Sequence, residues 1–335
     1  MRHVNIPIFV THMGCEHDCV FCNQKKIARA FPMSIEKARD IIDRAVKTLP
    51  KEGVYAEIAF FGGSFSGIDL FEQTNYLKLA KQYVDSGVVR SIRLSTRPDM
   101  IDEEILDNFK EHGVNAVELG VQSMDDEVLK MNKRGHSASD VVAAARLIKE
   151  YGFELGVQLM PGLFGDTYEK SVLSAKKAVS LLPDTARIYP TLVIKDTELC
   201  ALYRAGAFVP LSLDEAVKVS AQIYLIMKSA GVTVLRMGLM ANEGLNGDDL
   251  IAGPYHPAFG ELVAGRVMLQ KAREILNGRK APENIVIEVK RGEVSKMTGQ
   301  KRQNIDALKK EFCIKNIKVA QSDDVGDEEI RIIDA

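Results

Sequence analysis

Residues 14–23 read Gly14-Cys15-Glu16-His17-Asp18-Cys19-Val20-Phe21-Cys22-Asn23 and place three cysteines on one short segment, directly after an apolar run. Their spacing is Cys-x3-Cys-x2-Cys. Thiolates are the preferred ligands of iron–sulfur clusters. A [4Fe–4S] cluster held by only three thiolates keeps one iron free to bind another molecule. The triad therefore predicts an iron–sulfur site on Cys15, Cys19 and Cys22 with one open iron.

A structural zinc site is the alternative for this triad. Zinc usually takes four ligands, supplied as two distant pairs, and the sequence has no second Cys-x2-Cys or His-x3-His pair, although His12 and His17 could be recruited. The spacing therefore favours the cluster. Cys200 and Cys313 stand alone in the sequence and are expected to be buried apolar thiols.

Composition describes an ordinary globular enzyme. The chain has 335 residues, 46% hydrophobic content and a formal net charge of −2. This length suits one large α/β barrel plus a small appendage. The overall charge gives no general attraction to nucleic acid. No apolar run approaches the roughly 18 residues of a membrane-spanning helix, and no signal-peptide pattern is present at the start, so a cytoplasmic location is expected.

The chain alternates short apolar or β-branched runs with longer amphipathic segments, which is the pattern of a parallel sheet with helical crossovers. A helix is expected at 34–48 with Ser34 as its N-cap, and another at 102–111; Gly87, Gly113 and Gly152 are expected at helix ends. The pattern predicts an α/β protein with a partial (β/α)6 barrel like part of a TIM barrel. Its active site should lie at the carboxyl ends of the strands. The expected strands are 4–11, 55–61, 91–95, 116–121, 154–160 and 187–192.

Glycine and polar residues follow several of these strands. Gly62-Gly63-Ser64 comes after the second strand, Ser95 ends the third, and Gln122 ends the fourth. Gln158 lies near the end of the fifth. A strand of a parallel barrel is buried on both faces, so such polar side chains need hydrogen-bond partners in the core or in a ligand.

The triad, with Phe21 before its third cysteine, resembles the signature of the radical S-adenosylmethionine superfamily. The motifs at the strand ends resemble, in order and spacing, the radical domain of the Elongator catalytic subunit and its bacterial relatives. They are more distantly similar to oxygen-independent coproporphyrinogen III oxidase. The resemblance implies a [4Fe–4S] cluster whose fourth iron binds S-adenosylmethionine. It also implies reductive cleavage to a 5′-deoxyadenosyl radical, with an electron from a reductant such as flavodoxin or ferredoxin.

The resemblance also implies which residues bind S-adenosylmethionine. Gln122 and Arg134, twelve residues apart, match a glutamine and an arginine of the oxidase, and a guanidinium fits the methionyl carboxylate. Ser64 and Gln158 each replace an acidic residue of the family, so recognition near Ser64 is expected to rest on backbone groups. The full set of expected ligands is Gly62, Gly63, Ser64, Ser95, Gln122, Arg134 and Gln158.

Two segments have no clear role from sequence. Residues 236–257 are rich in Gly and Asn and are expected to form a loop insert, in which Tyr255 and His256 lie between prolines. Residues 187–197 resemble the Elongator segment at the end of its barrel, and are expected either to line the substrate side or to close the barrel.

A small basic β-α-β unit with an acidic tail is expected at 279–335, after a barrel domain at 1–278. Its expected elements are a strand at 285–290, a helix at 295–312 and a strand at 317–320. Residues 284–320 hold nine Lys or Arg and four Asp or Glu, so nine minus four gives +5. Such a surface could bind RNA phosphates. A merely solvated helix face is the alternative, because few aromatic residues interrupt the basic ones.

Three functions therefore stay open. The first is radical modification of RNA with a tRNA-like substrate. The second is a radical reaction on a porphyrin-type or other small molecule, and the third is a non-catalytic iron–sulfur protein. The chain is expected to lack the acetyltransferase domain of Elongator and the extra cysteine domain of methylthiotransferases.

Overall fold

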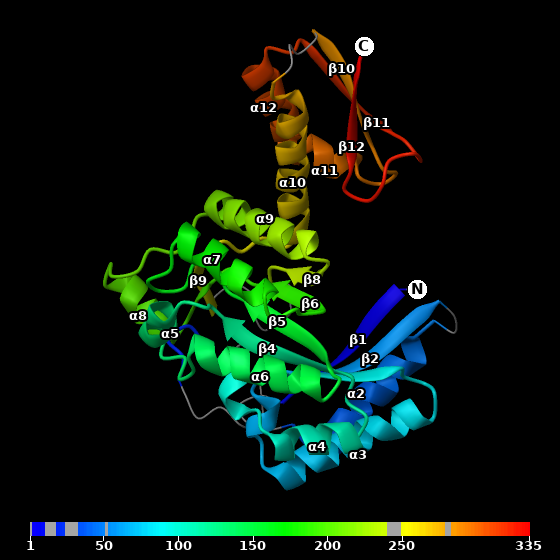
Figure 1. Cartoon of the computed structure of the whole chain (residues 1–335), viewed down its shortest axis with the longest axis vertical. Coiled ribbons are helices and arrows are strands. Elements are labelled where there is room, and N and C mark those ends of the chain that lie inside the picture. The colour runs from blue at the N-terminus through cyan, green and yellow to red at the C-terminus, as the bar shows by residue number, and fades with distance from the viewer. Residues whose placement is uncertain (1, 11–17, 24–32, 51–52, 240–248, 279–282) are drawn as a thin grey trace.

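The computed structural model describes residues 2–10, 18–23, 33–50, 53–239, 249–278 and 283–335. Figure 1 shows a larger part that contains a parallel sheet and a smaller carboxyl-terminal part, linked by the long helix α10 (Phe259–Leu276). None of the helices described here is both long and apolar enough to cross a membrane.

The larger part is an open parallel sheet with the strand order β1-β2-β3-β4-β5-β6-β8. Helices follow the strands and lie along one side of the sheet, as Figure 1 shows. The structure confirms the predicted partial barrel and adds a seventh strand, β8, to the six that were predicted. The strands are β1 (Arg2–Phe9), β2 (Val54–Phe61), β3 (Ser91–Thr96), β4 (Ala116–Gln122), β5 (Glu154–Leu159), β6 (Thr185–Ile188) and β8 (Thr233–Met237).

The helices begin and end where the local sequence supplies caps. The Ser34 side chain accepts a hydrogen bond from the Lys37 N–H and opens the first helix, as predicted. Gly87, Gly113 and Gly152 all have a positive φ just after helices, which also matches the prediction. The helices are α2 (Ile35–Thr48), α3 (Leu70–Asp85), α4 (Glu103–Glu111), α5 (Asp126–Met131), α6 (Ala138–Glu150), α7 (Tyr168–Val179), α8 (Glu198–Arg204) and α9 (Leu213–Ser229); short 3-10 turns lie at Phe65–Gly67 and Pro98–Met100.

The two faces of the barrel sheet differ because side chains alternate along each strand. One face packs against the helices in the main hydrophobic core, to which β2 contributes Ile58 and Phe60. The alternate positions face the inside of the barrel and include buried charged residues such as Glu57 and Glu118. The inner face is therefore polar where the outer face is apolar.

The predicted strand 187–192 is shorter than expected. β6 ends at Ile188, and Pro190 follows, which has no N–H for a sheet ladder. The chain then forms β7 (Val193–Ile194), which pairs with β9 (Leu250–Ala252) in a separate two-stranded sheet. The chain therefore leaves the barrel sheet after Ile188.

The carboxyl-terminal part has a three-stranded sheet with the order β11-β10-β12, covered by helices. The predicted helix 295–312 is broken, because Gly299, Lys301 and Arg302 have positive φ angles. The segment predicted as an acidic tail ends in a strand, which pairs antiparallel with β10. The elements are β10 (Asn284–Val289), α11 (Val294–Thr298), a 3-10 turn (Gln300–Arg302), α12 (Gln303–Phe312), β11 (Asn316–Gln321) and β12 (Ile330–Asp334).

The core of this smaller part also includes the second half of α10, through Met268, Leu269, Ala272 and Leu276. The proposed domain boundary at residue 278 stays a prediction. Cys313 was predicted to be buried, but it is exposed, because it forms the left-handed end of α12. Cys200 is buried, as expected.

Candidate active site

The described part of the cysteine segment, residues 18–23, forms a tight turn. The Cys22 N–H donates to the Cys19 carbonyl oxygen at 3.0 Å. Cys19 is buried and Cys22 is half-buried. Cys15 lies outside the described residues. Among those described, no three His, Cys, Asp or Glu side chains are grouped so that they could hold a metal.

Arg134 lies directly beside Cys19. Its Nη1 donates to the Cys19 Sγ at 3.4 Å, and its Nη2 donates to the Gly120 carbonyl oxygen at 2.8 Å. The Arg134 Nε is buried without a hydrogen-bond partner. An unsatisfied buried donor is costly, so a guanidinium with one donor in excess is suited to a bound anion. The donor chemistry therefore fits thiolate-bound iron and a carboxylate close to Cys19.

The end of β4 is shaped around this arginine. A Cβ atom on Gly120 would lie 2.8 Å from the Arg134 Nη2 and 2.9 Å from the Gln122 Nε2, so a larger residue there would displace the ends of these two side chains. Gln122 has a φ of 65° at an irregularity in the β4–β5 pairing. Its side-chain oxygen accepts a hydrogen bond from the Gln158 Nε2 at 3.0 Å. The structure thus brings together Cys19, Arg134, Gln122 and Gln158.

Ser64 and Ser95 are already engaged with protein partners. The Ser64 hydroxyl is 1% exposed and lies 2.9 Å from the Thr96 Oγ1. The Ser95 hydroxyl donates to the Glu118 Oε1 at 2.9 Å. Gly62 has a φ of 94°, and both Gly62 and Gly63 are half-buried. The backbone of this turn is therefore better suited to contact a ligand than the Ser64 side chain.

Buried charges on the inner face of the barrel were not predicted from the sequence. In one layer, Arg93 bonds Glu57 at 3.0 Å and Glu154 at 2.6 Å. In the next layer, the Arg187 Nε bonds the Glu118 Oε2 at 2.6 Å. The sequence does hold a signal for these buried charges, because several otherwise apolar strands carry a charged residue at alternate positions.

Arg187 has further contacts inside the barrel. Its Nη1 donates to the Tyr189 hydroxyl at 3.1 Å, and its guanidinium lies 4.9 Å from the centre of the Phe61 ring. Its Nη2 is buried without a partner. Burial raises the pKa of Tyr189, so its hydroxyl keeps its proton at neutral pH. Arg187 and Tyr189 thus offer hydrogen-bond donors on the inner face.

His136 is close to Arg134 but is uncharged at neutral pH. Burial, followed by the positive charge of Arg134, lowers the pKa of His136 to about 4. Its Nε2 lies 3.3 Å from the Val121 carbonyl oxygen, and its Nδ1 is buried without a partner. His136 therefore adds no positive charge beside Arg134.

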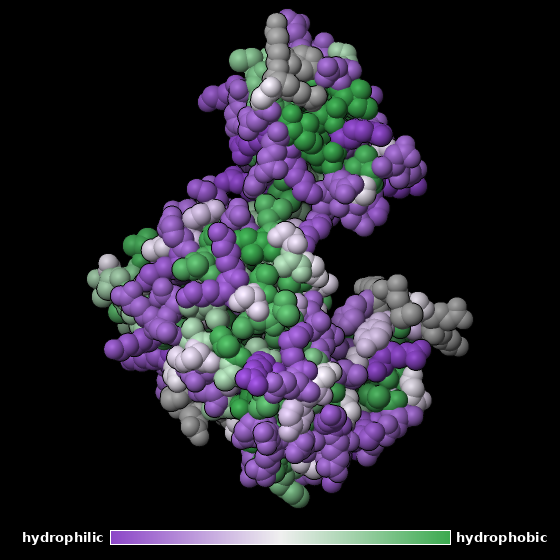
Figure 2. Space-filling view, in the orientation of Figure 1, coloured by the Kyte–Doolittle hydropathy of each residue, from purple (hydrophilic) through white to green (hydrophobic). Residues whose placement is uncertain are grey.

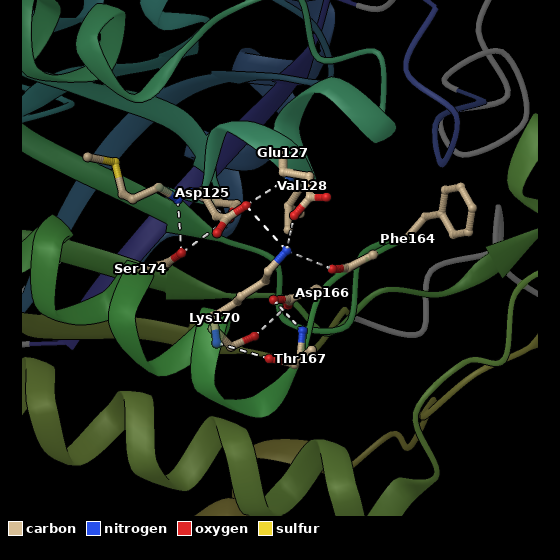
Figure 3. Close-up of polar contacts among 12 residues, drawn as sticks. Asp125, Glu127, Val128, Phe164, Asp166, Thr167, Lys170 and Ser174 are labelled. Atoms are coloured by element: carbon tan, nitrogen blue, oxygen red, sulfur yellow. Dashed lines mark hydrogen bonds and ion pairs between the residues drawn. The ribbon is translucent and has the colours of Figure 1, made fainter.

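The loop between β5 and α7 is held by a network of polar contacts (Figure 3). Asp166 accepts hydrogen bonds from the N–H groups of Gly162 and Thr167, each at 2.9 Å. Lys170 on α7 reaches the Glu127 carboxylate at 2.7 Å and the Asp125 carboxylate at 3.6 Å. These contacts join the loop after β5 to α5, the helix that precedes Arg134.

Tyr255 and His256 lie in a small cleft near the ends of β6 and β8, with Leu192 and Gly238. The His256 Nδ1 accepts a hydrogen bond from the Ala258 N–H at 3.1 Å, and its Nε2 lies 3.3 Å from the Gln300 Nε2. Leu192 is buried in this contact. Residue 256 therefore connects the carboxyl-end side of the barrel to the turn before α12.

Known proteins resemble this chain in sequence and in fold. The model of the radical SAM superfamily matches residues 9–175, and that of the Radical_SAM C-terminal domain matches residues 183–268. A tRNA uridine(34) acetyltransferase of Methanocaldococcus infernus is 38% identical over 191 residues, covering 51% of this chain and 36% of that protein. Human Elongator complex protein 3 is 28% identical over 159 residues, covering 46% of this chain and 29% of that protein.

Among solved structures, the archaeal Methanocaldococcus infernus Elp3 with an N-terminal deletion has the same fold, with a TM-score of 0.63 and 24% identity, covering 83% of this chain and 64% of that one. The chain matches only about a third of the length of these curated relatives. The two family models together span most of the barrel and include the cysteine segment. The chain is therefore an enzyme of the radical SAM superfamily, which uses a [4Fe–4S] cluster and S-adenosylmethionine.

Proposed function

We propose that this enzyme modifies RNA, with a tRNA-like substrate, by radical chemistry that starts from S-adenosylmethionine. The observation that carries the proposal is the 38% identity to a protein named tRNA uridine(34) acetyltransferase. That identity extends over 191 residues. The match covers only 36% of that relative, so the proposal does not extend the relative's own reaction on RNA to this chain.

The proposed cluster ligands are Cys15, Cys19 and Cys22. When bound, the cluster and S-adenosylmethionine supply one-electron cleavage of the sulfonium and hydrogen abstraction from the substrate. The proposed role of Arg134 is to hold the methionyl carboxylate. Its contact to the Gly120 carbonyl oxygen orients the guanidinium in advance, so less freedom is lost on binding.

The remaining proposed contacts to S-adenosylmethionine come from the neighbouring strand ends. Gln122 and Gln158, joined by their 3.0 Å hydrogen bond, offer amide groups to the ribose hydroxyls. Gly62 and Gly63 offer backbone groups to the amino end, with Ser64 and Ser95 supporting them through Thr96 and Glu118.

RNA would bind through the carboxyl-terminal part in this proposal. Several of its cations already have acidic partners, such as Lys290 with Asp327 and Lys315 with Glu283. Lys301 and Arg302 are exposed, and among the described residues they form no ion pair within 4.0 Å. Their turn lies beside His256 through Gln300, on the carboxyl-end side of the barrel. Phosphate groups are the natural partners of such free cations.

A flavodoxin or ferredoxin is the proposed electron donor, and the cytoplasm is the proposed location. The decisive experiment is the modified-nucleoside profile of RNA from cells with and without this chain. A nucleoside that disappears with the gene and returns with the intact protein, but not with Cys19→Ala, supports the proposal. An unchanged profile in RNA of every class would contradict it.

Binding of RNA is tested separately, by charge reversal at Lys301 and Arg302. Each phosphate contact should contribute about −0.7 to the slope of log affinity against log salt for a single strand, so the double reversal should flatten that slope by one or two contacts. Lys315→Glu, in the same part but at a paired lysine, is the control. Truncation at residue 278 is unsuitable, because it would expose the apolar face of α10.

A further inference from the structure

The turn at residues 132–134 lies between the cysteine segment and the loop after β5. Asn132 ends α5 and is completely buried, with 0% exposure. Lys133 follows with a φ of 51°, a left-handed conformation that reverses the chain direction. Arg134 then points back to Cys19. The position of Arg134 therefore depends on how this sharp turn is held.

The side chain of Asn132 anchors the turn to its surroundings. Its Nδ2 donates to the carbonyl oxygens of Val128, at 2.7 Å, and of Phe164, at 2.8 Å. Its Oδ1 accepts a hydrogen bond from the Phe164 N–H at 3.3 Å. Both amide N–H donors and the oxygen are thus in use. Phe164 belongs to the loop after β5, which the contacts of Asp166 and Lys170 hold in place (Figure 3).

The backbone of Asn132 in turn holds the cysteine segment. Its carbonyl oxygen accepts a hydrogen bond from the Val20 N–H at 3.2 Å. On its other side, the Val20 carbonyl oxygen accepts a hydrogen bond from the Leu199 N–H, in the first turn of α8, at 2.7 Å. Val20 is 1% exposed and packs in a hydrophobic cluster with Leu199 and Cys200. The residue after Cys19 is therefore fixed from both sides.

An ion pair at the surface also holds the turn at residues 132–134. The Lys133 Nζ lies 2.6 Å from the Glu198 Oε2, so the turn is also joined to α8. Three consecutive residues, Asn132, Lys133 and Arg134, thus contact Val20, α8 and Cys19 in that order.

We propose that Asn132 is a positioning residue that holds the cysteine segment ready for the iron–sulfur cluster and aligns Arg134 with Cys19. A binding segment that is already ordered loses less conformational freedom when its ligand binds and releases that ligand more slowly. Groups outside the ligand set tune metal sites in the same way. The proposal goes beyond the proposed function, since it holds for any substrate of the barrel.

The experiment compares two buried asparagines in the anaerobically reconstituted full chain. Asn304 in the carboxyl-terminal part is 3% exposed, and its Nδ2 also donates to two carbonyl oxygens, those of Gly265 and Lys296. Asn132→Ala and Asn304→Ala therefore delete matching contacts in different places. We expect Asn132→Ala to transfer iron to EDTA at least tenfold faster than the parent, and Asn304→Ala to transfer it at the parental rate.

The electron paramagnetic resonance spectrum of the reduced cluster gives a second readout. Adding S-adenosylmethionine should change the parental and Asn304→Ala spectra in the same way, and should change the Asn132→Ala spectrum less at the same concentration. If Asn132→Ala does not fold, Asn132→Leu has a similar side-chain size and removes both donated hydrogen bonds without burying a charge, and the same faster iron transfer is expected. Equal iron transfer in the Asn132 and Asn304 variants, or parental transfer in both Asn132 variants, would overturn the proposal.

Discussion

The two sheets of this protein place their charges in opposite ways. The barrel sheet buries Glu57, Arg93, Glu118 and Arg187 on its inner face, each at most 7% exposed. The carboxyl-terminal sheet has an apolar core, and its ion pairs, such as Arg331 with Glu288, lie at the surface. In Figure 2 this part has a mainly hydrophilic rim around a hydrophobic middle.

The difference separates the sheet that carries the candidate site from the sheet that does not. Strands of a parallel barrel are usually apolar on both faces, and a buried ion pair costs desolvation energy that an apolar pair would not. The smaller sheet follows the usual rule. The barrel sheet accepts the cost on the one face that lines its interior, where Arg187 is in register with Gln158 of the neighbouring strand. Within the two sheets, fully buried charged residues therefore occur only on the barrel sheet, which carries the candidate site.

The largest expected effect comes from breaking the buried ion pair between Glu118 and Arg187. Glu118→Ala would leave Arg187 buried with only the Tyr189 hydroxyl as a polar partner, and we expect a loss of about 3–5 kcal/mol in the free energy of unfolding. Urea denaturation measures this loss. The double variant Glu118→Leu with Arg187→Met removes both charges and should recover most of the stability. A loss under about 1 kcal/mol for Glu118→Ala would mean that this pair behaves like a surface pair.

The next effect concerns the cofactor rather than the fold. Arg134→Ala should keep the cluster but weaken S-adenosylmethionine binding at least tenfold, because a charge-assisted contact contributes on the order of 1.5–3 kcal/mol. Equilibrium binding under anaerobic conditions tests this, and iron content checks the cluster. Lys130→Ala, at an exposed lysine of α5, is the control. Unchanged affinity in Arg134→Ala would exclude its role in binding the cofactor.

A third prediction uses the pKa of His136. Because this pKa falls to about 4 on folding, the unfolded chain binds the proton more tightly, and stability decreases as pH falls from about 6.5 towards 4. Between pH 7 and pH 5 the loss from this residue should be about 2 kcal/mol. His136→Gln, which stays neutral, should lose that much less than the parent over the same range. Identical pH profiles of parent and variant, measured by urea denaturation, would argue against a buried neutral histidine.

The smallest effect is expected in the carboxyl-terminal sheet. Arg331→Ala removes an ion pair with Glu288 in which the arginine is 50% exposed, so the free energy of unfolding should fall by less than about 1 kcal/mol, and less still at high salt. The same denaturation measurement applies. A loss as large as that of Glu118→Ala would remove the contrast between the two sheets.

Local signals in the sequence determined much of this protein. The cysteine spacing indicated the superfamily, because three ligands on one short segment need no distant partner. Six barrel strands were found because each has its own apolar run between turn residues. The helix start at Ser34 and the helix end at Gly113 were found because capping depends on neighbouring residues only. Residue types at the strand ends predict a ligand site there, and this stays a prediction.

Only the tertiary structure decided which distant side chains meet. Glu118 and Arg187 are 69 residues apart, and the local sequence of neither strand predicts that these two residues pair. The sequence analysis assigned no role to Asn132, and the fold places it between Val20 and Phe164. The sequence of β12 alone predicts an acidic tail, and this segment forms a strand because it pairs with the edge of β10. Periodicity and capping act over a few residues, whereas pairing depends on the path of the whole chain.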